Sequence, residues 1–375
     1  MTTDNEILYT MALTRLSKLN STQQQLLLKQ MGSAEAVFEN RHDLGHLFQE
    51  QAPGAAAAIA GMESTLPRCE QELAYAQAHR IRILCWNDEA FPARLRNCED
   101  APILLYYLGA ANLNAPHVVS MVGTRRCTER GRDLCQSFVA ELKRLCPDVL
   151  VMSGLAYGID IASHRACLDN GVATVGVLAH GLDEIYPRVH RSTAIEMLKN
   201  GGLLTEYMSQ TTSEKMNFVQ RNRVVAGMAD ATVVVESAAK GGSLITAEMA
   251  SGYHREVFTF PGRLTDDASA GCNMLIRKNQ ATLITSAADL MEDMQWEPAP
   301  QPTSEAALQT TLFPNLTPDE QLVADTLLKQ DADLSLSELA NLLAMPQFKL
   351  TPILLALEMK GIVKLKAGQR YHLIR

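Results

Sequence analysis

The stretch VVSMVGTRRCTERGRDLCQSFVAELKRLCPDVLVMSGLAYGID, residues 118–160, decides the fold. It opens with an apolar run that ends at Gly123, and a basic turn follows. The middle part has apolar residues at helical spacing. A second apolar run then ends at Ser153 and Gly154. This order predicts a strand, a turn, a helix and a second strand, which together form one βαβ unit with parallel strands.

Both predicted strand ends lie at the edge of a parallel sheet where ligands bind. The first turn carries Arg125 and Arg126, and the second offers the backbone of Ser153 and Gly154. Guanidinium groups and free backbone N–H groups both favour phosphate. Arg125 stands where the dinucleotide fingerprint needs its second glycine, and the chain has no G-x-x-x-x-G-K-[ST] loop. The turn therefore predicts a site for a nucleic-acid backbone or a nucleotide rather than NAD or ATP; an ordinary turn with solvated arginines is the alternative.

Length and composition indicate a globular protein. The chain has 375 residues, of which 47% are hydrophobic and 20% charged, and two or three domains are expected. No apolar run reaches about 18 residues, so no membrane span is expected. The first residues lack a secretion signal and the eight cysteines form no C-x-x-C pair, which predicts a cytoplasmic protein without metal or cofactor. The net charge of −8 disfavours nucleic acid only weakly, because binding depends on a local basic patch.

The pattern of the chain predicts three domains and a linker. Residues 1–65 contain short helical segments typical of a SAM or helix-hairpin-helix module, with few basic residues. Residues 66–292 alternate strands and helices, which predicts an α/β domain with an extended Rossmann-like, mostly parallel sheet. Residues 293–317 are rich in proline, threonine and glutamine and predict a linker. Residues 318–375 predict a winged helix with a hairpin turn at Ala367-Gly368; protein contact is as well supported for it as duplex binding.

Basic, hydroxyl and glycine residues follow nearly every predicted strand of the α/β domain. They are expected to converge, because the carboxyl ends of parallel strands share one edge. One phosphate needs only two or three cations. The five cations expected at this edge therefore favour several phosphates in a row, as in a single strand of nucleic acid. Tyr186 and Phe218 could stack on bases or belong to the core. The strand-end residues are Arg125, Ser153, Arg188, Lys215, Arg221 and Arg223, the last two expected at the start of a helix, and Gly241 to Ser243.

Six short motifs follow one another along the chain: VGTRRCTERG (122–131), SGLAYGIDIASHRACL (153–168), GLDEIYPRVH (181–190), RNRVVAG (221–227), GGSLITAEMA (241–250) and VFTFPG (257–262). In this order they resemble the bacterial DprA/Smf family of DNA-processing proteins, and the resemblance covers essentially the whole chain. It implies an extended Rossmann-like fold that binds single-stranded DNA without catalysis. It also implies a homodimer that protects incoming strands and loads the recombinase RecA in natural transformation.

By matched position, the resemblance implies a phosphate pocket and a surface for self-association. Arg125, Arg188 and Lys215 match the pocket most clearly, with Arg188 standing where many relatives have lysine. The self-association segment matches Met274, Leu275 and Ile276, which could equally be ordinary core. The further expected members of the pocket are Gly123, Ser153, Gly154, Phe218, Arg221, Asn222, Arg223 and Ser243.

A nucleotide-cleaving enzyme on a related Rossmann-like fold is the main alternative. Asp160, His164 or Glu236 would then serve as acid or base, although a helix histidine beside a core is more often structural. The P-G-G-x-G-T-x-x-E type motif of such enzymes is absent, and the segment GGSLITAE at 241–248 resembles it only loosely. We therefore predict a protein that is not an enzyme. A scaffold that binds only through its terminal modules is a third possibility.

Overall fold

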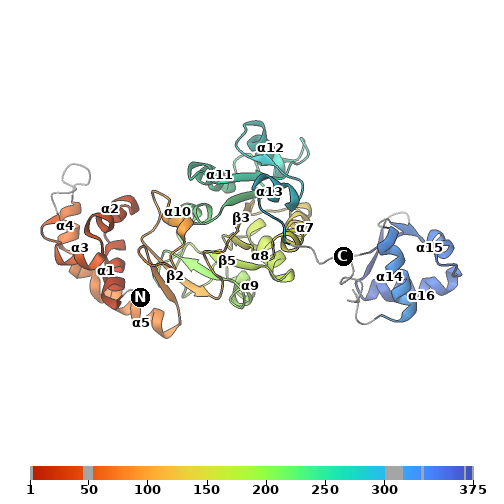
Figure 1. The fold of residues 1–375 in the computed structure, drawn as a ribbon, viewed down its shortest axis with the longest axis horizontal. Helices are drawn as coiled ribbons and strands as arrows, with labels where there is room; N and C mark the ends of the chain where they lie inside the picture. Colours follow the sequence, from red (N-terminus) through yellow and green to blue (C-terminus); the bar gives the residue numbers. More distant parts are fainter. Residues whose placement is uncertain (1–2, 45–53, 300–315, 331–332, 367–368, 374–375) are drawn as a thin grey trace. The chain divides into compact units, whose positions relative to one another are not determined.

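The protein consists of two compact units, residues 1–299 and 300–375. The larger unit contains a nine-stranded sheet and the smaller one a three-stranded sheet (Figure 1). The computed structural model describes residues 3–44, 54–299, 316–330, 333–366 and 369–373.

The nine-stranded sheet of the larger unit has the strand order β1-β2-β6-β5-β4-β3-β7-β8-β9. Strand β2 pairs antiparallel with β1 and with β6, and the other neighbours pair in parallel. The predicted α/β class with a mostly parallel sheet is confirmed. The strands are β1 (Arg82–Cys85), β2 (Leu104–Gly109), β3 (Val118–Gly123), β4 (Leu150–Ser153), β5 (Ala173–Val177), β6 (Gly202–Thr205), β7 (Ala231–Glu236), β8 (Glu256–Thr259) and β9 (Thr282–Leu283).

The βαβ unit expected from the sequence consists of β3, α7 (Glu129–Leu145) and β4. From β3 the chain builds the sheet in one direction through β4, β5 and β6. It then returns to add β7 and β8 on the other side of β3. Connections that leave β3 and β7 run in opposite directions, which opens a crevice beyond the carboxyl ends of these two strands. This is the topological switch point of the sheet.

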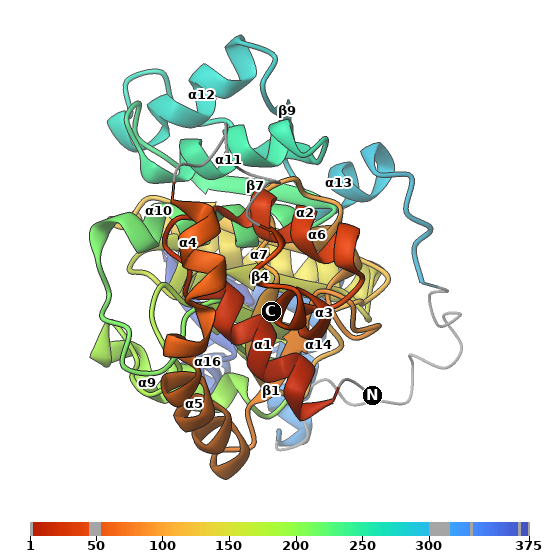
Figure 2. The ribbon, with the colours of Figure 1, turned by 90° about the vertical axis from the view of Figure 1, so that its left-hand side faces the viewer.

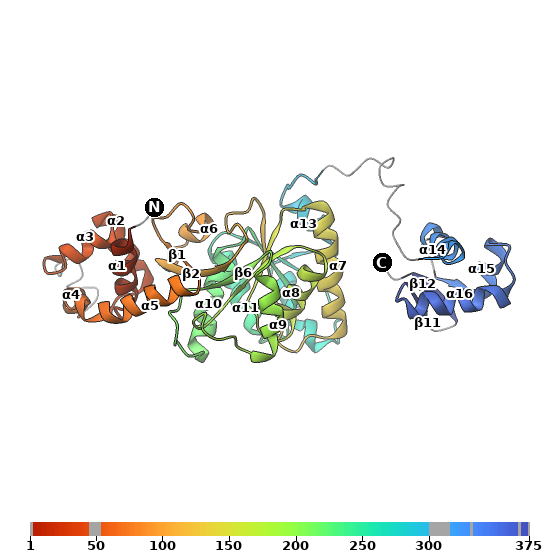
Figure 3. The same cartoon turned by 90° about the horizontal axis from the view of Figure 1, so that it is seen from below.

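Helices cover both faces of the sheet because side chains alternate along its strands. On β3, Val118 and Val122 pack in the same core as residues of α10 and α11, and Met121 packs on the opposite face with α7. Figure 3 shows α7, α8 and α9 side by side in the second layer. The further helices of the two layers are α8 (Ile159–Asp169), α9 (Arg191–Met197), α10 (Lys215–Gly227), α11 (Gly242–Gly252), α12 (Ala270–Arg277) and α13 (Ala287–Asp293).

The amino-terminal helices pack against the β1–β2 edge of the sheet, and Figure 2 shows this group from its outer side. Met11 and Leu27 belong to the same continuous core as Leu104 of β2. The Gln25 side-chain amide also donates a hydrogen bond to the carbonyl of Ala101 at 2.8 Å. Residues 1–65 therefore share a compact unit with the sheet. These helices are α1 (Asp4–Thr14), α2 (Ser21–Met31), α3 (Ala34–Glu39), α4 (Ala55–Ala60) and α5 (Leu66–Ala78), and α6 (Ala93–Arg96) follows β1.

The described part of the smaller unit has three helices and an antiparallel sheet in the order β10-β12-β11 around its own core. Helix α16 exposes Phe348 (76%), Leu355 (57%) and Met359 (84%), an apolar face unlike the polar and basic surface that reads a duplex groove. The predicted hairpin turn, Ala367-Gly368, lies outside the described residues. The elements are α14 (Pro318–Gln330), β10 (Leu334–Ser335), α15 (Leu336–Leu342), α16 (Gln347–Met359), β11 (Val363–Lys366) and β12 (Arg370–Leu373).

Much of the predicted linker, 300–315, lies outside the described residues, but its first part packs on the larger unit. The Trp296 ring lies 4.3 Å from the His117 ring, and the Ala299 N–H donates to the Leu145 carbonyl at 2.8 Å. In the part of the chain that is described, no single helix is long and apolar enough to cross a membrane. The bent pair Leu336–Leu343 and Gln347–Met359 meets that criterion by length and composition only.

Candidate functional site

A pocket of about 710 Å³ opens at the switch point of the sheet. Its walls are the turn after β3, the turn into α8, one face of α10 and the turn into α11. Eight of the eleven residues that the sequence assigned to a phosphate pocket line it: Gly123, Arg125, Gly154, Lys215, Phe218, Arg221, Asn222 and Ser243.

Close backbone packing holds the turn that carries Arg125. The Thr124 N–H donates to the Glu236 carbonyl at 2.7 Å, and the Thr124 carbonyl accepts from the Ile159 N–H at 3.1 Å. Gly158 has φ +79°, and a Cβ built on it would lie 2.0 Å from the Thr124 carbonyl oxygen, so a residue without a side chain is required. The turn is therefore fixed between β7 and α8, while the Arg125 side chain is exposed.

Exposed cations and an aromatic ring gather around this pocket. The Arg125 guanidinium lies 5.5 Å from the centre of the Phe218 ring, and that ring lies 5.8 Å from the half-exposed ring of Tyr186. A cation beside an aromatic face can pair with a phosphate while the ring stacks on a base. Lys240 was not among the predicted wall residues, although it directly precedes Gly241 to Ser243, which were expected at this edge. The exposed cations of the lining are Arg125, Arg126, Lys215 and Lys240.

Three helices, α8, α10 and α11, begin at the pocket without a side-chain cap. The first backbone N–H groups of a helix have no partner within it, and the helix dipole favours an anion there; in α8 the first of them, the Ile159 N–H, is already bonded to the Thr124 carbonyl. Helix α7 differs, because Thr128 caps it and Glu236 accepts hydrogen bonds from the Thr128 N–H (2.8 Å) and hydroxyl (2.7 Å). The Glu236 carboxylate therefore holds the start of α7 in place and does not line the pocket.

Two buried charges form the floor of the pocket. Arg221 is 4% exposed and donates hydrogen bonds to the carbonyls of Gly154 and Val177. Burial raises the pKa of Asp160, an effect that the charge of Arg221 opposes, and burial also lowers the pKa of Arg221. A Cβ on Gly154 would lie 2.5 Å from this guanidinium. Arg221 thus ties two strand ends together and adds positive potential from below.

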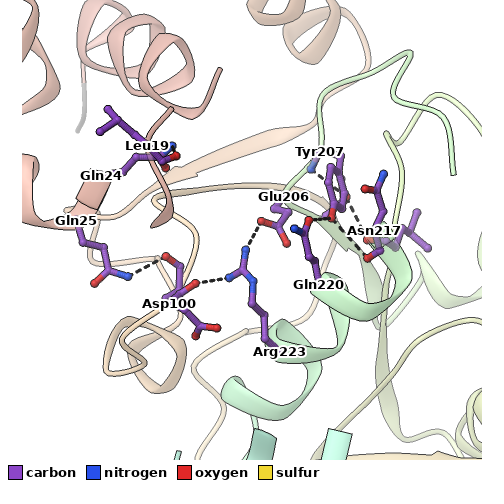
Figure 4. Close-up of polar contacts among 12 residues, drawn as sticks. Leu19, Gln24, Gln25, Asp100, Glu206, Tyr207, Asn217, Gln220 and Arg223 are labelled. Carbon is purple, nitrogen blue, oxygen red and sulfur yellow. Dashed lines mark hydrogen bonds and ion pairs between the residues drawn. The ribbon is translucent and has the colours of Figure 1, made fainter. Parts of the chain in front are cut away.

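Arg223 lies outside the pocket wall. Helix α10 begins at Lys215, so the predicted start near Arg221 was wrong and the Arg-Asn-Arg motif lies within the helix. Residues two apart on an α-helix are separated by about 200° around its axis, and Arg221 and Arg223 therefore point to opposite sides. Arg223 forms an ion pair with Glu206 and donates to the Asp100 carbonyl at 2.5 Å (Figure 4).

Ser153 and Arg188 are also not part of the lining. Ser153 is fully buried and its hydroxyl donates to the Met121 carbonyl at 2.6 Å, which joins β4 to β3. Arg188 is exposed at the start of a 3-10 helix, Arg188–His190, two residues after Tyr186. The Tyr186 ring contacts the ring of Phe218, a wall residue of the pocket. Arg188 therefore lies near the pocket.

The groups considered for acid–base chemistry are not arranged for it. His164 is fully buried outside the pocket, its Nδ1 bonds to the Thr174 hydroxyl at 2.7 Å, and burial lowers its pKa to about 3. Asp160 is the one carboxylate in the described lining. Among the described residues, no group of three His, Cys, Asp or Glu is placed to hold a metal ion. The pocket offers anion binding and stacking.

The predicted self-association segment lies on α12. Leu275 is 5% exposed and packs in the core of its own chain. Met274 and Ile276 are partly exposed and remain available at the surface of the larger unit.

Comparison with known proteins points to one family. The model of the family "DNA recombination-mediator protein A" matches residues 82–295, which include the whole lining of the pocket. DNA processing protein DprA of Streptococcus pneumoniae is 35% identical over 209 residues, 56% of this chain and 73% of that protein. The X-ray structure of DprA from Streptococcus pneumoniae matches with a TM-score of 0.66 at 28% identity, covering 78% of this chain and 99% of that one. A structure of DNA processing protein A from Helicobacter pylori, which describes its single-stranded DNA binding mode, matches with a TM-score of 0.52 at 28% identity, covering 58% and 96%.

Proposed function

The chain belongs to the family of DNA recombination-mediator protein A, and on this premise we propose that it binds single-stranded DNA in the switch-point pocket without reacting with it. The observation that carries the proposal is the convergence of exposed cations, uncapped helix starts and the Phe218 ring in one pocket. The relative from Helicobacter pylori, described as a single-stranded DNA binder, supports it.

The chemistry of the pocket favours a single strand over a duplex. Arg125 and Lys215 suit phosphates, which every sequence offers alike. The Phe218 face can receive a base only if that base is unstacked, and the bases of a duplex are already stacked on each other. We expect binding that is sensitive to salt, tolerant of sequence and weak for duplex DNA.

The same site gives no support to the enzyme alternative. Glu236 is bound to the start of α7, and His164 lies away from the lining. Asp160 lines the pocket but is only 8% exposed, and its carboxylate lies beside Arg221 and accepts a hydrogen bond from the Ala156 N–H at 3.3 Å. The side chains that could transfer a proton, Asp160, His164 and Glu236, therefore make contacts that hold the fold.

We also propose the partners that the family implies. A homodimer would join through the exposed surface of α12, with Met274 and Ile276 as contacts and Leu275 supporting them from the core. The bound strand would be passed to the recombinase RecA during natural transformation. Sedimentation of the Met274→Glu/Ile276→Glu variant tests the dimer, which should dissociate, and the rate of RecA filament assembly on protein-bound DNA tests the transfer.

Fluorescence anisotropy of labelled oligo-dT with the full chain, over a series of salt concentrations, tests the pocket. Replacing Arg125 by alanine removes one exposed cation from the wall. We expect affinity to fall at least about tenfold for all sequences, because hydrogen bonds to charged groups are worth about 1.5–3 kcal/mol. The slope of log K against log salt should flatten by about 0.7, the value for one phosphate contact on a single strand.

Arg144→Ala is the matched control, because this exposed arginine ends α7 at the far edge of the sheet. Its affinity and salt slope should equal those of the parent. Equal binding by Arg125→Ala and the parent would remove the pocket from the proposal. Release of base or phosphate from nucleoside monophosphates by the parent would restore the enzyme alternative.

A further inference from the structure

A second hollow begins on the other side of the Arg125-Arg126 turn, and we propose that it continues the path of the single strand beyond the pocket. This α7–α8 groove has a volume of about 530 Å³ and runs along the first turns of both helices. The proposal rests on the function proposed for the pocket. The lining of the groove includes Arg132 and Asp133 of α7, Arg165 of α8, and Tyr157 just before α8.

The α7–α8 groove adjoins the pocket, because the side chains of one turn line both hollows. Arg125 and Arg126 line the two hollows. The turn between them is held by the contact of Gly158 with Thr124 described above. A strand whose phosphates meet Arg125 in the pocket therefore meets Arg126 as it crosses into the groove.

The charge of the α7–α8 groove suits a polyanion. Beyond the shared turn, Arg132 comes from α7 and Arg165 from α8, so a cation stands on each side. The Arg132 guanidinium donates to the Cys127 carbonyl at 3.4 Å, which holds it near the mouth. Glu129 and Asp133 also line the groove and equal Arg132 and Arg165 in number, so the excess of positive charge comes from Arg125 and Arg126 of the shared turn.

Tyr157 provides a stacking surface at the mouth of the groove. Its ring is half exposed and meets the buried ring of His190 edge to face, with 5.0 Å between the ring centres. The His190 Nδ1 is bonded to the Leu155 carbonyl at 2.9 Å, which fixes the platform. An aromatic ring beside arginines is the combination that receives a base and its phosphate.

The walls formed by α10 and by the turn into α11 place exposed apolar side chains beside Lys215 and Lys240. There the lining includes Val219 and Ile245, which are 36% and 39% exposed. Met216, close by on α10, is 64% exposed. The groove offers a charged backbone four arginines, whereas these walls offer two lysines, so the α7–α8 groove is the favoured direction.

The test compares a short and a long labelled oligo-dT, about 6 and about 20 nucleotides, so that only the long one extends past one site. The variant Arg132→Ala/Arg165→Ala should bind the short oligonucleotide as the parent does. For the long one we expect at least a tenfold loss and a salt slope smaller by about 1.4, which is two phosphate contacts. Asp133→Asn should bind the long oligonucleotide a few-fold more tightly, because it removes a repelling charge.

The control variant, Arg144→Ala/Lys199→Ala, removes two exposed cations at the opposite edge of the sheet and should leave both affinities unchanged. If the parent binds neither oligonucleotide, the function proposed for the pocket fails first. If the parent binds both and the double variant also binds both equally well, the groove proposal alone is overturned. A loss of both lengths in the double variant, or the same loss in the control, also overturns it.

Discussion

His164 should make the larger unit lose stability as the pH falls below neutral. Burial, with the charges of Arg221 and His190, lowers the pKa of His164 to about 3, whereas an unfolded histidine titrates near 6.5. Between these values the unfolded chain binds a proton that the folded chain excludes, so stability is lost as pH falls from about 6.5 towards 3. Each pKa unit corresponds to about 1.4 kcal/mol, and the loss between pH 7 and pH 5 is about 2 kcal/mol.

The variant His164→Asn tests this value, because the amide can keep the bond to the Thr174 hydroxyl and does not titrate. Urea unfolding would be followed by the fluorescence of Trp86 and Trp296, the two tryptophans of the chain, which both lie in the larger unit. The free energy of unfolding should depend on pH less in the variant, by about 2 kcal/mol between pH 7 and pH 5. The control Thr174→Val should lower stability and keep most of the pH dependence. Parallel curves for parent and His164→Asn would refute the assignment of this pH dependence to His164.

Two further substitutions test contacts that hold the larger unit together. Glu72 is 3% exposed, forms an ion pair with Arg68 and accepts a hydrogen bond from the Ser209 N–H at 2.9 Å. Glu72→Ala should therefore lower the free energy of unfolding by about 3 kcal/mol in a urea titration. Alanine at the exposed Glu63 is the control and should change that free energy by less than about 1 kcal/mol. Gly158→Ala would bring a Cβ to 2.0 Å from the Thr124 carbonyl oxygen. The substitution should lower the free energy of unfolding by at least about 1 kcal/mol and weaken oligo-dT binding. Anisotropy titrations equal to those of the parent would contradict the supporting role of this turn.

The sequence predicted the centre of the site because its signals there are local. An apolar run followed by small residues, then a helix with one apolar face, describes β3, α7 and β4. The topology then forces the ends of β3 and β4 to one edge. Eight expected wall residues lie together for that reason. The sequence could not predict that Ser153 is buried, because a serine at a strand end gives the same sequence pattern whether its hydroxyl faces a ligand or a neighbouring strand.

Helix α10 shows why other parts could not be predicted. Its residues pack against the sheet, against α11 and along the pocket, so no single apolar stripe marks its start. The three-residue Arg-Asn-Arg motif looked like one wall, but helical geometry divides it between the pocket and the ion pair of Arg223 with Glu206. The sharing of one core by the amino-terminal helices and β2 likewise has no local signal, because it joins residues about 90 positions apart, such as Met11 and Leu104.

The net charge of −8 and the proposed nucleic-acid site are compatible for a physical reason. At physiological ionic strength, exposed charges separated by more than about 8 Å are largely screened from each other. A bound strand therefore responds to the lining of the pocket, where five cations face a single, buried carboxylate, and little to acids elsewhere on the chain. An acidic surface outside the site also repels DNA that approaches it in other places. Local cations with an acidic remainder would thus confine binding to the proposed pocket and groove, which a uniformly basic protein of the same affinity would not achieve.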